Sequence, residues 1–136
     1  MKIEDAIFEG CFVELEPTDQ GYNICKLSGV IDIEHGLFTA CSNSVPLLKT
    51  NDFIKEFETF CTNQHLEPKL EGVYDTYFHF YARVNTHRRE LILMEFSIGD
   101  ATMYPFVSNL KGLFEIDSHK LSSILSDFKE LAKMSY

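Results

Sequence analysis

Apolar and polar residues alternate along several short stretches of the first half of the chain, and this period of two restricts the fold more than any other feature. In "CFVELEP", Cys11, Val13 and Leu15 are apolar, whereas Glu14 and Glu16 face the other way. Successive side chains of a β-strand point to opposite faces, so the pattern is typical of a half-buried strand. The runs "YNICKLSGVIDIE" and "LFTACSN" read in the same way. The first 43 residues are therefore predicted to form short strands, with a further edge strand in "KIEDAIFE".

The period changes to that of a helix in "TNDFIKEFETFCTNQ". Apolar residues recur here at helical spacing, which places them on one face of an α-helix of about 14 residues that we expect to pack on the sheet. Thr50 or Asn51 is expected to cap the helix, and Asp52 suits the first turn, where a negative charge is stabilised. The apolar face comprises Phe53, Ile54, Phe57, Phe60 and Cys61.

The second half repeats the order of strands followed by a helix. The runs "KLEGVY", "TYFHFYARV" and "RELILMEFSI" are strand-like, and "LFEI" is a shorter candidate. Residues 99–112 are expected to be a loop because Gly99, Pro105 and Gly112 interrupt them. An amphipathic helix follows in "DSHKLSSILSDFKELAKM", and Asp117 or Ser118 is expected to cap it.

Length and composition indicate one folded domain that spans residues 1–136. With 45% hydrophobic residues and twelve Phe, the chain can bury a core without disulfides. The predicted class is α+β, with a mostly antiparallel sheet in strands-helix-strands-helix order and two amphipathic helices packed on the sheet.

The charge balance restricts the partners of the domain. The formal charge is −9, and residues 1–46 contribute −6 of it, from eight acids and two bases. This sign disfavours nucleic acid and anionic lipid as partners and favours a basic protein. The chain has no signal-peptide pattern at its start and no apolar run of membrane-spanning length, so we expect a cytoplasmic protein.

No motif in the sequence predicts catalysis or metal binding. The cysteines form no C-x-x-C pair, the histidines show neither H-x-x-x-H nor H-E-x-x-H spacing, and no nucleotide-binding glycine pattern occurs. We therefore expect no catalytic residue, no cofactor and no metal. A Cys–His pair assembled by folding is the alternative that the sequence leaves open. The cysteines and histidines from which such a pair could form are Cys11, Cys25, Cys41, Cys61, His35, His65, His79, His87 and His119.

The run "VYDTYFHFYARV" contains the densest group of aromatic residues. On one face Tyr77, His79 and Tyr81 form an amphipathic row, which is either cross-strand packing or a protein-contact surface. Stacking of nucleic-acid bases is disfavoured because few basic residues accompany the aromatic ones. The opposite face, which is predicted to be core, comprises Tyr74, Phe78, Phe80, Ala82 and Val84.

Four acidic residues form the second candidate site. Glu14 and Glu16 lie on the polar face of one predicted strand, and Asp32 and Glu34 lie on that of the next. If these strands pair, the four carboxylates form one patch, which is either a solvated face or a docking site for a basic protein. Acid-base catalysis would require an environment that separates their pKa values, and nothing in the sequence indicates one.

Two longer runs resemble a known family. "VPLLKTNDFIKEFETFCTNQ", followed by an acidic and aromatic strand region and then by "LFEIDSHKLSSILSDFKEL", is similar to the small bacterial immunity proteins of the WapI type. Those proteins place a helix after an N-terminal sheet, and a strand leads through an Asp into their terminal amphipathic helix. The similarity covers roughly residues 22–134 in the order of elements.

The resemblance implies a cytoplasmic protein that binds a cognate toxin domain, often a nuclease, and blocks it without performing chemistry. The acidic residues Glu14, Glu16, Asp32 and Glu34 would then be electrostatic contacts, and the row at 77, 79 and 81 would supply buried anchors. Two other classes stay open. One is an interaction or oligomerisation module, such as a homodimer, and the other is a small-molecule-binding protein or an enzyme with a deep pocket.

Overall fold

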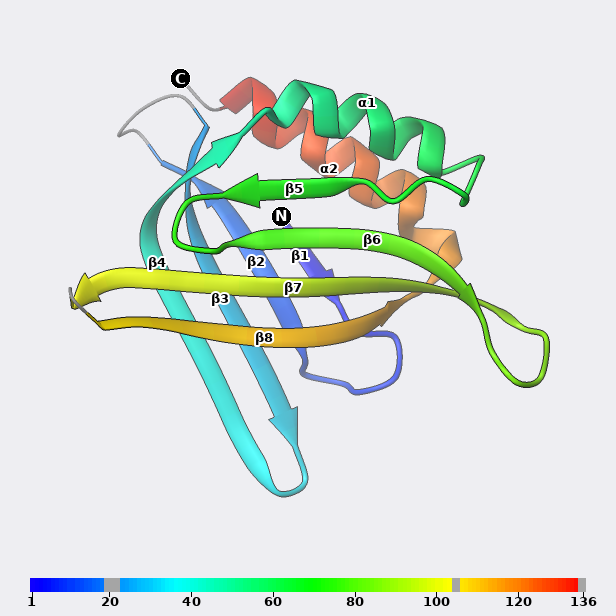
Figure 1. Cartoon of the computed structure of the whole chain (residues 1–136), viewed down its shortest axis with the longest axis horizontal. Helices are drawn as coiled ribbons and strands as arrows, with labels where there is room; N and C mark the ends of the chain where they lie inside the picture. Colours follow the sequence, from blue (N-terminus) through cyan, green and yellow to red (C-terminus); the bar gives the residue numbers. More distant parts are fainter. Residues whose placement is uncertain (19–22, 104–105, 135–136) are drawn as a thin grey trace.

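Each strand of the domain pairs antiparallel with the next one along the chain. In the computed structural model, which describes residues 1–18, 23–103 and 106–134, the eight strands form one sheet in the order β1 to β8 (Figure 1). The predicted α+β class with an antiparallel sheet is confirmed. The elements are β1 (Lys2–Glu4), β2 (Phe12–Pro17), β3 (Ile24–Ile33), β4 (Gly36–Leu48), α1 (Thr50–Phe60), β5 (Lys69–Gly72), β6 (Tyr77–Val84), β7 (Glu90–Met103), β8 (Phe106–Ile116), the 3-10 helix η1 (Ser118–Lys120) and α2 (Leu121–Met134).

The long strand β4 joins two halves of the sheet that face each other. It pairs with β3 over most of its length but with β5 only at Leu47 and Leu48. The sheet therefore folds over at β4, so that β7 and β8 cross β3 and β4, while α1 and α2 lie side by side at one end of the molecule (Figure 1). No helix of the described ranges is long and apolar enough to cross a membrane.

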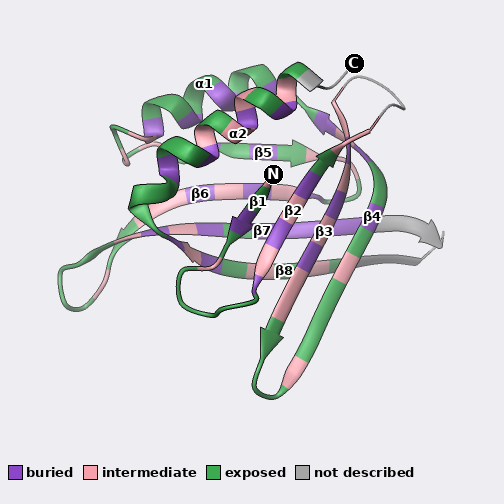
Figure 2. Ribbon diagram, turned by 180° about the vertical axis from the view of Figure 1, so that it is seen from behind, coloured by how far each residue is buried: buried purple, intermediate pink, exposed green. Residues whose placement is uncertain are grey.

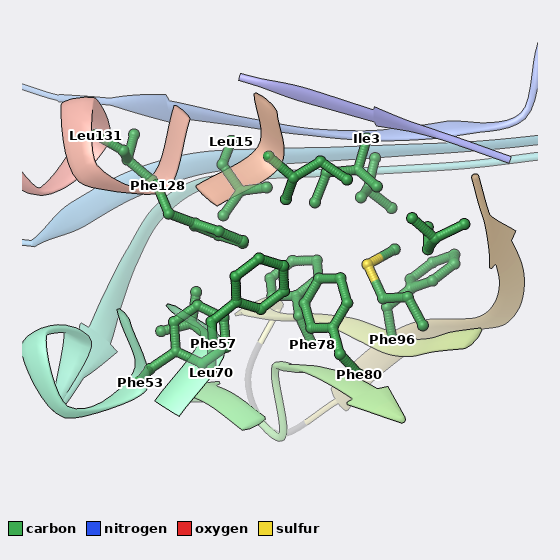
Figure 3. Packing of buried hydrophobic residues seen from close by; sticks show 14 of the residues in the cluster. Ile3, Leu15, Phe53, Phe57, Leu70, Phe78, Phe80, Phe96, Phe128 and Leu131 are labelled. Atoms are coloured by element: carbon green, nitrogen blue, oxygen red, sulfur yellow. The ribbon is translucent and has the colours of Figure 1, made fainter. Parts of the chain in front are cut away.

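The core lies between the two halves of the sheet and is closed at the helical end by phenylalanine rings. Phe57 of α1 packs edge to face on Phe80 of β6, with ring centroids 4.8 Å apart, and lies 5.5 Å from Phe128 of α2 (Figure 3). Phe53 of α1 lies 4.9 Å from Phe128. Edge-to-face aromatic pairs stabilise a core beyond the burial of their area. The buried positions along β2, β3 and β6 alternate mainly with partly buried ones (Figure 2).

The two helices begin differently from each other. Asp117 accepts a hydrogen bond from the backbone N–H of His119 at 2.9 Å and so caps the 3-10 helix η1, which leads directly into α2. At α1 the N-cap is Lys49, with a left-handed φ of 51° and no side-chain cap, so the predicted cap at Thr50 or Asn51 is wrong. Thr50 is instead buried inside the first turn.

The expected loop over residues 99–112 is wrong, because its described residues belong to β7 and β8. Both glycines serve close packing in these strands. A Cβ on Gly112 would lie 2.5 Å from the Phe96 ring, and one on Gly99 would collide with the carbonyl oxygen of Tyr74. A glycine in a strand often marks such a close approach of other groups. Pro105 lies outside the described residues.

The aromatic run is placed partly as predicted. Phe78 and Phe80 are fully buried, but Tyr74 and Val84 are exposed, so their assignment to the core is wrong. Tyr74 precedes β6 and has a left-handed φ of 60°, in the turn that leads from β5. Val84 lies at the end of β6, where the β6–β7 hairpin extends away from the helices (Figure 1).

Gly99 is expected to tolerate no side chain. The Gly99→Ala variant should lose about 2 kcal/mol or more of stability, because the turn at Tyr74 has to move away from β7. Urea unfolding measures the loss. The control is Gly36→Ala, whose Cβ meets only the ring of exposed Phe38 and should change stability by less than about 1 kcal/mol. Equal losses in both variants would contradict the proposed role of Gly99.

Candidate protein-binding surfaces

The aromatic row lies on the outer face of β6, as predicted from its period. Tyr77, His79 and Tyr81 are half-buried and alternate with the buried residues Phe78 and Phe80. The His79 and Tyr81 rings lie 5.1 Å apart. The neighbouring strands hold the row in place, since β7 pairs with all three residues and β5 pairs with Tyr77 and His79. The row is therefore a rigid, partly apolar strip on a central strand.

Charged side chains of both signs surround this row. His79 has two carboxylates at 4.0 Å, with its Nε2 facing Glu67 and its Nδ1 facing Glu95. The Tyr77 hydroxyl donates to Glu95 Oε1 at 3.4 Å. Lys69 Nζ lies 4.7 Å from the centre of the Tyr77 ring. Rings bordered by charges match the anatomy of a protein interface, in which an aromatic centre has a polar rim.

The four predicted acidic residues form two pairs and not one patch. Strands β2 and β3 do pair, but Glu14 lies opposite Ser28, four residues before Asp32. At about 3.4 Å per residue, this places Asp32 roughly 13 Å farther along the sheet. Glu34 lies in the turn between β3 and β4. The expectation of a single acidic patch is therefore wrong, because the strand register separates the two pairs.

The two acidic pairs also differ in their surroundings. Glu14 lies across from Lys2 of β1, and Glu16 lies across from Lys26 of β3, so lysines interrupt the first pair. The second pair, Asp32 and Glu34, is exposed at the tip of the β3–β4 hairpin. Of the two acidic pairs, the pair at the hairpin tip is therefore the one whose negative charge is less neutralised by neighbouring lysines.

The sequence analysis missed that the β3–β4 hairpin exposes large apolar side chains. Ile33, Leu37 and Phe38 are exposed near its tip, where Leu37 is 64% accessible. Alternation along β3 puts Ile33 on the same face as the buried residues Cys25 and Leu27, but alternation does not show whether another layer covers that face. The adjacent pair Leu37 and Phe38 was the available signal, since it puts an apolar side chain on each face.

The surface hollow beside β4 is open and has few ionisable groups in its lining. It has a volume of about 540 Å³ and is lined by apolar and small polar side chains. Within the described ranges no three residues among His, Cys, Asp and Glu lie close enough to hold a metal ion. The hollow is lined by Leu37, Phe38, Thr39, Ala40, Cys41, Ile98, Asn109 and Leu110.

Comparison with known proteins gives no match to this chain. No protein-family model, no curated protein and no solved structure is significantly similar to it.

The buried Cys25 thiol should make stability depend on alkaline pH. Burial raises the pKa of Cys25 to about 11, whereas an unfolded cysteine titrates near 8.5. The folded state holds the thiol proton of Cys25 more tightly than the unfolded state does. The stability that results is therefore fully present below about pH 8.5 and is lost as the pH rises to about 11. At about 1.4 kcal/mol per unit, the loss should be roughly 2–3 kcal/mol.

Urea unfolding of the wild type and of Cys25→Ala at several pH values measures this contribution. The wild type should lose more stability than Cys25→Ala between pH 8 and pH 11. Cys41→Ala is the control, because it removes an exposed thiol instead of a buried one. Parallel pH profiles for the wild type and Cys25→Ala would contradict the expectation.

Proposed function

We propose that this chain is a non-catalytic immunity protein that binds a cognate bacterial toxin domain in the cytoplasm and blocks it by occlusion. The observation that carries the proposal is the half-buried row Tyr77, His79 and Tyr81 on the outer face of a central strand. Tyrosine combines a large apolar ring with a polar tip and is enriched in protein interfaces. The toxin as the partner comes from the resemblance to immunity proteins.

Charge supports a basic partner, such as a nuclease domain. The net charge of −9 gives an attractive field toward a nucleic-acid-binding surface, and such complementarity speeds association. Charges of both signs surround the aromatic row, and they favour one orientation of the bound partner. Any other orientation would place like charges of the two proteins together. Blocking then requires only that the bound protein covers the toxin's active surface.

Co-expression with the toxic domain encoded beside this chain tests the proposal. We expect growth to be rescued and a complex to co-purify. If a folded, toxic domain from that neighbouring gene gives neither rescue nor a complex, the immunity function is wrong for that pair. A stable homo-oligomer with no such toxin gene would instead favour an oligomerisation module.

The aromatic row should contribute most of the affinity for the partner. Tyr77→Ala and Tyr81→Ala should each weaken the purified complex by about tenfold or more, as truncation of interface anchors does. Calorimetric titration gives the affinity, and urea unfolding shows whether each variant is still folded. The control is Val84→Ala, at an exposed position at the end of the same strand. If both tyrosine variants bind as tightly as Val84→Ala, the row is not the interface.

The two acidic pairs should differ in their effect on association. The double variant Asp32→Lys with Glu34→Lys should slow association at low salt several-fold more than Glu14→Lys with Glu16→Lys, because lysines already flank the latter pair. Stopped-flow measurements at increasing salt would show the difference shrinking. Equal association rates for both double variants would show that the hairpin tip does not make the electrostatic contact.

A further inference from the structure

Strand β8 is the last strand of the sheet. Among the residues that the structure describes, β7 is the one strand that pairs with it. Near its end, the Glu115 N–H donates to Asp5 Oδ1 and the Glu115 carbonyl accepts from the Ala6 N–H, both at 2.9 Å. The backbone groups of Glu115 therefore point away from β7.

The same edge continues along β8 toward Asn109. Backbone groups two residues apart in a strand point to the same side, so those of Leu113, Lys111 and Asn109 also face away from β7. Within the described residues no strand pairs with this part of the edge. A row of unpaired N–H and C=O groups is a template for another strand.

The β3–β4 hairpin passes beneath β8 and continues beyond it (Figure 1). A Cβ on Gly112 of β8 would lie 3.0 Å from Cδ1 of Ile31, so Ile31 marks the crossing point. Ile33 follows two residues later on the same face, about 6.6 Å farther along the strand. Ile33 is 42% exposed, and Phe38, which pairs with Ile31, is 53% exposed.

The hairpin therefore exposes an apolar face, formed by Ile33 and Phe38, which no strand of the described residues covers. We call this face the apolar floor. Neighbouring strands lie about 4.8 Å apart, so one further strand beside β8 would lie over Ile33 and Phe38. The β1–β2 loop limits this position at the Glu115 end, where Ala6 occupies the edge. That loop carries two more exposed apolar residues, Ile7 and Phe8.

We propose that an extended segment of a basic partner protein adds to β8 at this position as a ninth strand. Its backbone would pair with Asn109, Lys111 and Leu113, and its inward apolar side chains would cover Ile33 and Phe38. Addition of a strand to a free edge is a common mode of peptide recognition, in which the main chain supplies affinity and alternate side chains supply specificity.

Charge around the position favours this occupant over a second copy of the chain. Glu34 is exposed in the turn that ends the floor, and Glu9 is exposed in the β1–β2 loop. A segment with Lys or Arg at alternate or flanking positions would compensate these carboxylates. Two copies, each with a charge of −9, would instead bring them together. Identification of the partner segment as part of the toxin rests on the proposed function.

A short synthetic peptide of alternating lysine and valine tests the edge without any toxin. Titration into the wild type, followed by NMR, should shift the amide signals of Lys111 and Leu113 and slow their hydrogen exchange. A peptide with glutamate in place of lysine should bind at least about tenfold more weakly. Failure of the lysine peptide to bind, or equal binding of the two peptides, would overturn the inference.

Variants at Leu113 test the pairing itself. Leu113→Pro removes an N–H that points away from β7, so the β7–β8 hydrogen bonds stay intact, as for prolines tolerated at strand edges. It should weaken peptide binding by at least about tenfold relative to Leu113→Val, which keeps the N–H and suits a strand. Thermal unfolding and the amide spectrum check that both variants fold. Equal peptide affinity in the two folded variants would overturn the pairing.

A second pair of variants tests the apolar floor. Ile33→Lys should weaken the peptide, whereas Val84→Lys, at an exposed position on the β6–β7 hairpin, should not. Equal peptide affinities of these two variants would show that the apolar floor is not part of the binding site. If the wild type forms a dimer that Leu113→Pro abolishes, the occupant is a second copy and the inference is wrong.

The toxin complex separates this inference from the proposed function. If the complex forms with equal affinity in Leu113→Pro and Leu113→Val, the edge is not its binding site, while the immunity function stands. If no toxin complex forms with the wild type, the immunity function fails, and the peptide titration still decides whether the edge accepts a basic strand.

Discussion

The contact among four phenylalanine rings determines how the rest of this domain is arranged. Phe53 and Phe57 of α1 meet Phe80 of β6 and Phe128 of α2, with ring centroids between 4.8 and 6.2 Å apart. Loss of one such ring typically costs about 3–5 kcal/mol, which is a large part of the 5–15 kcal/mol that stabilises a domain of this size. Because Phe80 is fixed in this cluster, its neighbours His79 and Tyr81 have to face outward. The core thereby orients the candidate binding row.

Close contact between the two halves of the sheet depends on residues without side chains. A Cβ on Gly29 of β3 would lie 2.8 Å from Ile98 of β7, and one on Gly112 of β8 would meet both Phe96 and Ile31. The layers approach closely where these glycines lie, so the strands can cross without a gap. Beyond the crossing, no strand of the described part of the chain covers the inner face of the β3–β4 hairpin, and Ile33 and Phe38 are exposed. The same packing that closes the core leaves the floor beside β8 uncovered.

The sequence predicted which side chains share a face much better than it predicted which faces are covered. Alternation placed Phe78 and Phe80 inside and Tyr77, His79 and Tyr81 outside, because the period of a strand is a local property. The exposure of Ile33 depends on where β8 crosses, which no local pattern contains.

The remaining errors have the same cause, since contacts distant in sequence overrode local preferences. Gly99 and Gly112 suggest a loop by composition, yet they lie in strands because other parts of the chain leave no room for a side chain there. Glu14 and Asp32 were assigned to one patch because each faces outward, but strand register decides their distance. The capping role of Asp117 was predicted correctly for the 3-10 turn η1 that leads into α2, because it depends on Asp117 and its immediate neighbours alone.

The aromatic row and the free edge of β8 lie on one continuous surface. His79 pairs with Glu95 of β7, and Glu95 pairs with Leu113 of β8, so these residues form one row across three strands. At about 4.8 Å between strands, Leu113 lies only about 10 Å from His79. A folded partner whose segment pairs with β8 would extend this sheet, and the body of that partner would be held beside Tyr77, His79 and Tyr81. Typical interfaces cover about 800 Å² on each protein, which is wide enough to include both features. The backbone edge would then fix the register of the partner, and the aromatic row would supply the anchors.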